Sequence, residues 1–257
     1  MPVRSFSTVA RTNLSKSEVH IWKIPLDIPY SSYYYSILDG KERERLRKLR
    51  TYESYKQYLV CRYSIKNILS SYIGCLASEC FISYTKRHKP FLENARIPLK
   101  FNISHSKNLA VCVVTLDESI GVDLEFIRPI ENLEGLSEYV LSRKERLLFY
   151  SMSKEGRLRF FYKIWTRKEA FLKACGDGFL TETPLNNLKI YPTKPFCSGI
   201  GGIPFFRYKK RWVFNDIVFS QKGGSYQLTL FREKKIGRIR HYNFYPSVCG
   251  IQQAHFC

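Results

Sequence analysis

The segment from residue 120 to residue 126 constrains the fold most, because its apolar and charged side chains alternate with the period of two that is typical of a strand. Val122 and Leu124 are apolar, and Asp123 and Glu125 alternate with them. Successive side chains of a strand point to opposite faces, so the two carboxylates share one face. Side chains two apart lie roughly 6–7 Å from each other. The charges therefore repel and need a nearby cation, which predicts a core on one face and a charged site on the other.

The segment from residue 156 to residue 174 has the period of a helix. Its apolar residues recur at helical spacing and predict a buried stripe: Leu158, Phe161, Trp165 and Leu172. The stripe should be apolar at position 168 or 169, but Lys168 and Glu169 stand there. A carboxylate at the wet edge of an apolar stripe is a candidate site residue.

The length and the charge of the chain limit its class. The 257 residues suffice for one large domain or for two lobes of about 100–130 residues. Hydrophobic residues make up 44%, so the chain can build a core. The 42 Lys and Arg outnumber the 22 Asp and Glu, giving a net charge of +20. Such a charge predicts acidic partners such as nucleic acid, anionic lipid, a phosphorylated small molecule or an acidic protein.

The compartment is also constrained. No apolar run approaches the roughly 18–20 residues of a membrane span, so we expect no membrane partner. The eight cysteines form no Cys-x-x-Cys pair, which favours reduced thiols in a cytoplasmic protein. The segment from Met1 to Ser17 is rich in Ser and Arg, and we expect a disordered lead there rather than a transit peptide.

The order of elements predicts an α+β fold with two similar lobes, residues 18–117 and 118–257. The first lobe should contain a strand near residues 19–26, helices over 41–50 and 53–72 that Gly74 ends, and strands over 81–85 and 109–116. The second should contain the strand over 120–126, helices over 142–152 and 156–174, and a hairpin of 212–220 and 226–232.

Asp123, Glu125 and Glu169 form a set of carboxylates without a His or Cys cluster. Such hard oxygen ligands suit Mg²⁺, which shares phosphate oxygens with a substrate. Lys168 and Lys173 flank the helical carboxylate, as a polyanionic phosphate substrate would require. The alternative is that the strand carboxylates face solvent and that Glu169 and Lys173 form an i,i+4 surface pair.

Three segments of the sequence resemble the motifs of a known family. Gly-Val-Asp-Leu-Glu over 121–125, followed by Trp-Thr-x-Lys-Glu-Ala-Phe-x-Lys over 165–173, resembles the paired signature of the 4'-phosphopantetheinyl transferases. Phe-Asn-Ile-Ser-His-Ser over 101–106, preceded by Lys89-Pro90, is similar to the larger, Sfp-type branch. The resemblance spans about residues 37–180.

The resemblance implies a Mg²⁺-dependent enzyme with two pseudo-symmetric lobes, its active site in the cleft between them, and a monomeric state. Such enzymes move the phosphopantetheine arm of coenzyme A to a serine of an acidic apo carrier protein and release 3',5'-ADP. Asp123, Glu125 and Glu169 would hold Mg²⁺. Glu169 would also be the base for the serine, directly or through a metal-bound water, and Lys173 would contact the transferred phosphate.

The resemblance also implies a set of residues that bind coenzyme A. These are Arg43, Arg45, His88, Lys89, Pro90, Ser104, His105, Lys168 and Lys173. Glu145 falls where the family often has another acid, although a helix cap explains it equally well. Asp177 lies where relatives often carry a basic residue, and no role is assigned to it.

A nucleic-acid-binding module without catalysis is the alternative function. The net charge, the 18 Tyr and 18 Phe, and the basic-aromatic stretch over 205–212 favour it. No RNP, KH or zinc-finger pattern is present, and this alternative gives no reason for three carboxylates at motif positions. We therefore expect no nucleic-acid partner.

Overall fold

The computed structural model describes residues 12–86, 88–175, 184–190, 196–197, 199–200, 203–204, 212–233, 237–246 and 253–256. The elements before residue 118 are β1 (Glu18–Pro25), α1 (Tyr33–Ser36), α2 (Gly40–Arg47), α3 (Tyr52–Ile73), the 3-10 helix η1 (Ala77–Glu79), β2 (Ile82–Tyr84), β3 (Pro90–Leu92), β4 (Leu99–Ser106) and β5 (Leu109–Leu116). The later elements are β6 (Ile120–Phe126), α4 (Leu133–Val140), α5 (Arg143–Tyr150), α6 (Lys154–Cys175), the 3-10 helix η2 (Leu185–Asn187), β7 (Phe196–Cys197), β8 (Gly199–Ile200), β9 (Ile203–Pro204), β10 (Trp212–Gln221), β11 (Gly224–Glu233), β12 (Arg238–Tyr245) and β13 (Gln253–Phe256).

Two sheets repeat one plan. In the first, β1 pairs antiparallel with β5, and β5 pairs antiparallel with β4. In the second, β6 pairs antiparallel with β11, and β11 pairs antiparallel with β10. Each half thus runs strand, helices and two further strands. The expected mixed α+β fold with two related lobes is confirmed.

The last strands return to the first sheet. β12 pairs in parallel with β1, and the first sheet has the order β13-β12-β1-β5-β4. β12 therefore lies beside the first strand of the chain, although it belongs to the segment 118–257 that we assign to the second lobe. The division of the chain at residue 118 stays a prediction.

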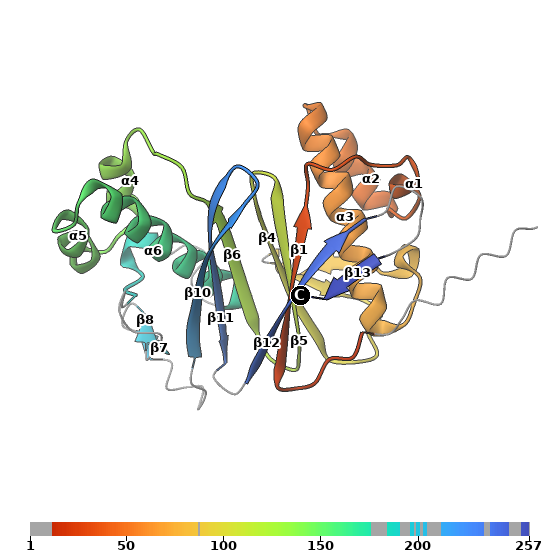
Figure 1. The fold of residues 1–257 in the computed structure, drawn as a ribbon. Coiled ribbons are helices and arrows are strands. Elements are labelled where there is room, and N and C mark those ends of the chain that lie inside the picture. The colour runs from red at the N-terminus through yellow and green to blue at the C-terminus, as the bar shows by residue number, and fades with distance from the viewer. Residues whose placement is uncertain are drawn as a thin grey trace, which may run out of the picture.

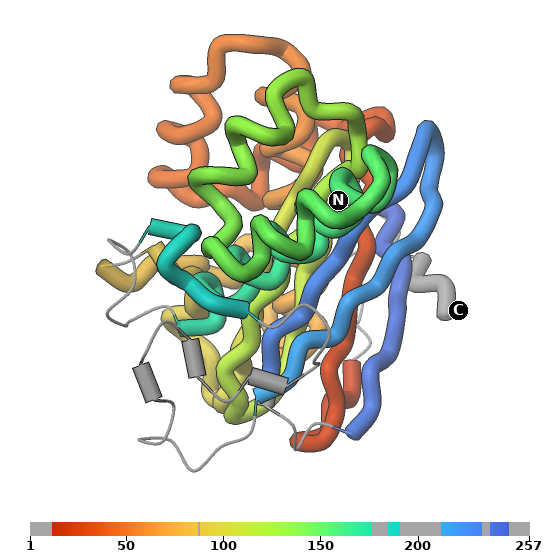
Figure 2. Tube along the Cα trace, turned by 90° about the vertical axis from the view of Figure 1, so that its left-hand side faces the viewer, coloured from red at the N-terminus to blue at the C-terminus, as the bar shows by residue number. Residues whose placement is uncertain are grey.

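Helices flank the sheets on their outer sides. In Figure 1, α1–α3 lie on the right and α4–α6 on the left, with the strands between them. Figure 2, viewed from the side of α4–α6, shows these helices in front of the strands. Buried side chains of β1 and β5, including Ile21 and Val111, pack against buried side chains of β6 and β11, including Val122 and Leu228. The core between the two sheets therefore joins the lobes.

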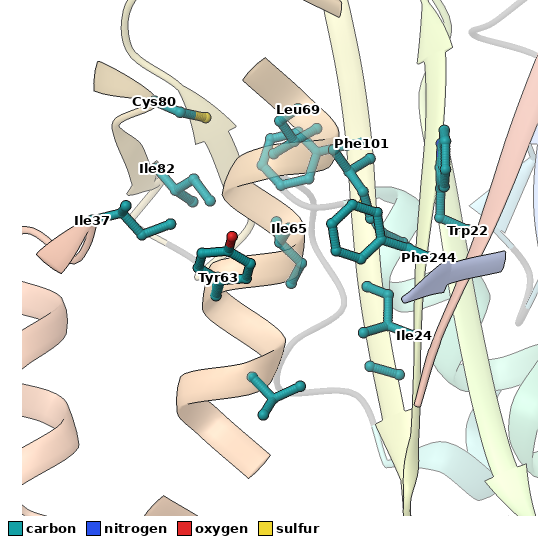
Figure 3. Close-up of a cluster of buried hydrophobic side chains, with 14 of the residues drawn as sticks. Trp22, Ile24, Ile37, Tyr63, Ile65, Leu69, Cys80, Ile82, Phe101 and Phe244 are labelled. Atoms are coloured by element: carbon teal, nitrogen blue, oxygen red, sulfur yellow. The ribbon is translucent and has the colours of Figure 1, made fainter. Parts of the chain in front are cut away.

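The outer face of the first sheet packs on α3. Trp22 and Phe101 of the sheet lie in one cluster with Tyr63 and Leu69 of α3 (Figure 3), and Phe244 of β12 belongs to the same cluster. β5 is buried on both faces, because its alternate residues enter the two different cores. This explains its uninterrupted apolar run.

Local signals set several of the element ends. α3 ends at Gly74, whose φ of 71° is the left-handed C-cap conformation. At the start of α5, Glu145 Oε2 accepts from the Ser142 N–H at 2.7 Å, which is one half of the expected capping box, whereas the Ser142 hydroxyl has no hydrogen-bond partner among the described residues. β10 and β11 form the expected hairpin, with Gln221 opposite Gly224.

Two observations concern the start of the chain and its helices. Residues 1–11 of the expected lead lie outside the described residues, whereas the Thr12 N–H donates to the Ser71 carbonyl at 3.1 Å. Among the described helices, none combines the length and the apolar character that crossing a bilayer requires.

Candidate active site

The face of β6 that bears the carboxylates looks toward α6. Gly121, two residues before Asp123, touches the helix so closely that an added Cβ would lie 1.9 Å from the Ala170 carbonyl oxygen and 2.6 Å from the Ala174 nitrogen. Only a glycine allows backbone to approach backbone in this way. The strand and the helix that carry the two motifs are therefore in direct contact, as their pairing in the sequence suggested.

Asp123 is buried at the centre of this contact. Its Oδ1 accepts hydrogen bonds from the Lys173 ammonium at 2.6 Å and from the Ser104 hydroxyl at 3.0 Å. Its Oδ2 is buried and has no hydrogen-bond partner among the described residues. Burial raises the pKa of Asp123, and Lys173 opposes that shift. The carboxylate is thus held from both lobes, with one oxygen still unsatisfied.

Glu125 and Glu169 are partly buried and repel their neighbours. Burial raises the pKa of Glu125, and the charges of Asp123 and Glu169 raise it further. Burial and the charge of Asp123 likewise raise the pKa of Glu169. Glu125 accepts a hydrogen bond from the Ser106 hydroxyl at 2.9 Å. The three carboxylates therefore form one electrostatic group.

This group suits a hard cation by charge and by donor type. One ammonium, that of Lys173, faces three carboxylates, and a buried oxygen of Asp123 has no partner. Carboxylate oxygens are the ligands that Mg²⁺ prefers. In the part of the chain that the structure describes, no three His, Cys, Asp or Glu side chains are close enough to form a metal site as they stand. Donor chemistry and charge fit Mg²⁺, and the ligand set is not closed.

His105 interacts electrostatically with Asp123 and with cationic side chains of two further elements. His105 of β4 is exposed, and partial desolvation lowers the pKa of its ring. The positive charges of Lys173 on α6 and Arg45 on α2 lower that pKa further. His105 and Ser104 point to opposite faces of β4, as neighbours on a strand must. The two cations, together with the ring N–H of His105, form a candidate site for an anion.

Arg43 has different neighbours. Its Nη2 donates to the Ser36 carbonyl at 3.2 Å, and its guanidinium lies 4.9 Å from the centre of the Tyr35 ring. Residues two apart on a helix point in different directions, so Arg43 and Arg45 cannot share one ligand face. Of this predicted pair, the structure brings Arg45 toward His105.

A buried ion network fastens α2 to α3. Glu42 of α2 accepts from the Lys66 ammonium at 2.9 Å and lies 3.4 Å from Nε of Arg62. Glu42 also accepts from the Asp39 N–H and completes the capping box of the helix. This network was not predicted, because Asp-x-x-Glu over 39–42 indicates a helix cap but not the partners Lys66 and Arg62 on another helix. The network fixes the helix that carries Arg45.

The loop between β2 and β3 reaches from the first lobe to α6. The Lys89 ammonium donates to the Ala174 carbonyl at 2.7 Å, next to the C-terminal end of α6. A cation is favourable there because the last carbonyls of a helix carry negative partial charge. His88 is exposed and has a φ of 61°, and Pro90 begins β3. Lys89 thus links this loop to the helix that carries Glu169 and Lys173.

The structure contradicts the predicted contact between Lys168 and coenzyme A. It is fully buried, and its ammonium donates to Glu145 Oε2 and the Val140 carbonyl, each at 2.7 Å, and to the Leu185 carbonyl at 3.0 Å. An ammonium has three N–H donors, so none remains for a phosphate. Glu145 is buried, accepts from the Ser142 and Ile190 N–H groups, and serves as a cap and ion-pair partner. The break in the helical stripe is therefore a buried ion pair at position 168 and a partly buried carboxylate at position 169.

Comparisons with protein families agree with the two lobes. The model of the 4'-phosphopantetheinyl transferase superfamily matches residues 119–231. The model of the N-terminal part of 4'-phosphopantetheinyl transferases matches residues 28–116. The fold and these matches define a two-domain transferase.

Individual relatives lead to the same family. HetI, a 4'-phosphopantetheinyl transferase of Nostoc sp. (strain PCC 7120 / SAG 25.82 / UTEX 2576), is 36% identical over 186 residues, which cover 71% of this chain and 78% of HetI. Sfp, a 4'-phosphopantetheinyl transferase of Bacillus subtilis (strain 168), is 26% identical over 167 residues, which cover 65% of this chain and 71% of Sfp. The chain belongs to the 4'-phosphopantetheinyl transferase family, and it transfers the 4'-phosphopantetheinyl group of coenzyme A to carrier proteins.

A solved structure of a holo-(acyl-carrier-protein) synthase from Bacillus anthracis aligns with 45% of this chain and 94% of its own, at 18% identity and a TM-score of 0.31, too low to support an argument. The transferase prediction is confirmed by the family matches, so the nucleic-acid-binding alternative is set aside. Most of the stretch that favoured the alternative, residues 205–211, lies outside the described residues, as does Asp177.

Proposed function

We propose that Asp123, Glu125 and Glu169 hold Mg²⁺ and that the enzyme uses it to transfer the arm of coenzyme A to a serine of an acidic apo carrier protein. The observation that carries this proposal is the group of three mutually repelling carboxylates, which faces one lysine and includes a buried oxygen without a partner. A bound Mg²⁺ would neutralise charge on the pyrophosphate oxygens.

The reaction needs a base for the carrier serine, and Glu169 is the proposed one. The serine oxygen forms a bond to the phosphorus that bears the pantetheine arm, the bond from that phosphorus to the leaving 3',5'-ADP breaks, and the serine proton passes to Glu169. The raised pKa of Glu169 supports this role, because a carboxylate of higher pKa is the stronger base. Among the described residues, no hydrogen bond or ion pair engages Glu169.

Other residues of this chain would hold coenzyme A. Lys173 forms an ion pair with Asp123 and would contact the phosphate that is transferred. Arg45, whose positive charge acts on His105 together with that of Lys173, would bind the 3'-phosphate with the His105 ring. Ser104 lies between Asp123 and Lys173, and the loop of Lys89 and its neighbours His88 and Pro90 would lie along the adenine.

The net charge of +20 supports an acidic carrier, because opposite charges speed encounter at low salt. One chain supplies both lobes, so we propose that the enzyme acts as a monomer.

The carrier itself is to be found by experiment: incubate the protein with Mg²⁺, coenzyme A and a panel of apo carriers, and measure the mass gain of each carrier. A chelator should abolish the gain.

The base is tested by Glu169→Gln, which keeps the shape of the side chain and removes its basicity. We expect transfer to fall by at least about 100-fold, the lower end of what a positioned acid or base contributes. Glu155→Gln is the matched control, because Glu155 is exposed on the same helix. A Glu169→Gln variant as active as wild type would remove Glu169 from this role.

A further inference from the structure

Side chains of β4 take the place of a backbone ladder along one edge of β6. The Asn102 Oδ1 accepts from the Val122 N–H at 3.1 Å, and the Ser104 hydroxyl accepts from the Leu124 N–H at 3.2 Å. The Ser106 hydroxyl accepts from the Phe126 N–H at 3.0 Å. The partners advance together by two residues, so every second side chain of β4 meets every second N–H of β6. We call these three contacts the side-chain ladder.

The ladder joins strands of different sheets. β4 is an edge strand of the first sheet, and β6 is an edge strand of the second, where its other edge pairs with β11. Without the ladder, the N–H groups of alternate β6 residues would be buried without acceptors, which is costly. The ladder therefore fixes the register of β6 against the first lobe.

Two members of the ladder have a second contact. The Ser104 hydroxyl donates to Asp123 Oδ1, and the Ser106 hydroxyl donates to Glu125 Oε2 at 2.9 Å. A hydroxyl can do both, because it has one donor and two lone pairs. Asn102 accepts from the Val122 N–H of β6 in the same way, but among the described residues it makes no hydrogen bond to a carboxylate. The ladder thus contains its own comparison between a purely structural contact and a contact that also orients a candidate ligand.

We propose that Ser106 is a positioning residue, which holds the Glu125 carboxylate in the orientation that the reaction requires. The Phe126 N–H of β6 donates to the Ser106 hydroxyl and fixes its position. The same hydroxyl donates to the Glu125 carboxylate, so the backbone of β6 orients Glu125 through Ser106 of the first lobe. This inference rests on the proposed role of Glu125 as a ligand of Mg²⁺. It concerns the residues that orient such ligands, which affect affinity although they never touch the metal.

The test measures binding of Mn²⁺ alone, as a spectroscopic probe for the site, by electron paramagnetic resonance of the full chain without substrate. Loss of an orienting hydrogen bond typically weakens metal affinity 10–100-fold, so Ser106→Ala should raise the Kd for Mn²⁺ by about 10-fold or more. Ser106→Thr keeps the hydroxyl and should stay within about twofold of wild type.

Asn102→Ala is the control for a structural effect. It removes the contact to Val122 N–H and should lower the Tm, while the Kd for Mn²⁺ stays within about twofold of wild type. Should Ser106→Ala fail to fold, Ser106→Cys replaces it, because a thiol is a weak donor of similar size and should give an intermediate Kd.

The outcomes separate this inference from the proposed function. If Ser106→Ala lowers the Tm as Asn102→Ala does and leaves the Kd unchanged, Ser106 is structural and the inference is wrong. If Glu125→Gln weakens Mn²⁺ binding and Ser106→Ala does not, the metal site stands and the inference fails alone. If Glu125→Gln binds Mn²⁺ as wild type does, the proposed metal site itself fails.

Discussion

Two glutamates of the second lobe differ in how their charge is compensated. Glu145 has a lysine ammonium and two N–H donors around it, so its charge is fully satisfied inside the protein. Glu169 has no hydrogen bond or ion pair among the described residues, and the charge of Lys173 that acts on it is shared with two other carboxylates. A charge that the fold satisfies is structural, whereas a charge that the fold leaves unsatisfied requires a ligand. The distinction makes Glu145 part of the framework and supports the proposed site role of Glu169.

The pair of Lys168 and Glu145 should therefore matter for stability rather than for binding. Lys168→Met keeps the length of the side chain but leaves the buried Glu145 charge without its cation. Removing one partner of a buried pair costs about 3–5 kcal/mol of unfolding free energy, to be measured by urea denaturation. Lys144→Met, at an exposed position of α5, should change this free energy by less than about 0.5 kcal/mol. An unchanged denaturation midpoint for Lys168→Met would contradict the pairing.

Helical spacing predicted that position 168 or 169 interrupts an apolar stripe, and this much was correct. Spacing did not separate the two residues, because a buried ion pair and a wet site both place charge beside apolar side chains. The partner of Lys168 is Glu145, more than twenty residues away, and a pattern along one helix carries no information about it. Ser106 was not predicted as a site residue for a similar reason, because its partner Glu125 lies on another strand and the pattern along one strand does not show such a contact.

At the scale of elements, the contact of β6 with α6 determines how the two motifs meet. Gly121 allows the helix backbone to touch the strand, which places Lys173 on Asp123. The first motif thus contains its own spacer residue, two positions before the first carboxylate.

Gly121→Ala tests this spacing. The added methyl group would overlap backbone atoms of α6, and backbone cannot turn aside as a flexible side chain does. We expect α6 to shift away from β6, with a loss of about 1–3 kcal/mol of unfolding free energy and at least a tenfold loss of transfer activity. The control is Gly40→Ala, because nothing lies within 4 Å of a Cβ at Gly40. A Gly121→Ala variant with wild-type activity and Tm would show that the contact is not needed.

Elements with a strong period were predictable, and elements without one were not. The strand over 120–126, the helix ending at Gly74 and the last hairpin agree with the structure, since apolar period, caps and turn residues all pointed the same way. α4 was not predicted, because its eight residues contain Gly135 and Ser137 and are too short for a clear period. β4 looked like a loop, because the side chains that form the ladder are polar.

At the scale of the whole molecule, the chain closes on itself. β12 lies beside β1, and Tyr242 of β12 stacks on Trp22 of β1 with ring centres 4.5 Å apart. Phe244 enters the same core, on the α3 side of the first sheet. No strand was predicted over residues 238–245, and a strand pattern would not have identified its partner. The first lobe therefore depends on residues from the far end of the chain.

This dependence predicts that the two lobes unfold together. A chain truncated after Glu233 lacks β12 and β13, so β1 loses its parallel partner and Trp22 loses its ring contacts with Tyr242 and Phe244. We expect the truncated chain to show no cooperative thermal transition when followed by near-ultraviolet circular dichroism. We also expect it to have no transferase activity. Tyr242→Ala provides a graded version, because removing a buried aromatic ring costs about 3–5 kcal/mol and should lower the urea midpoint without changing cooperativity. A truncated chain that melts at the Tm of the full chain would show that β12 is an accessory to the first sheet.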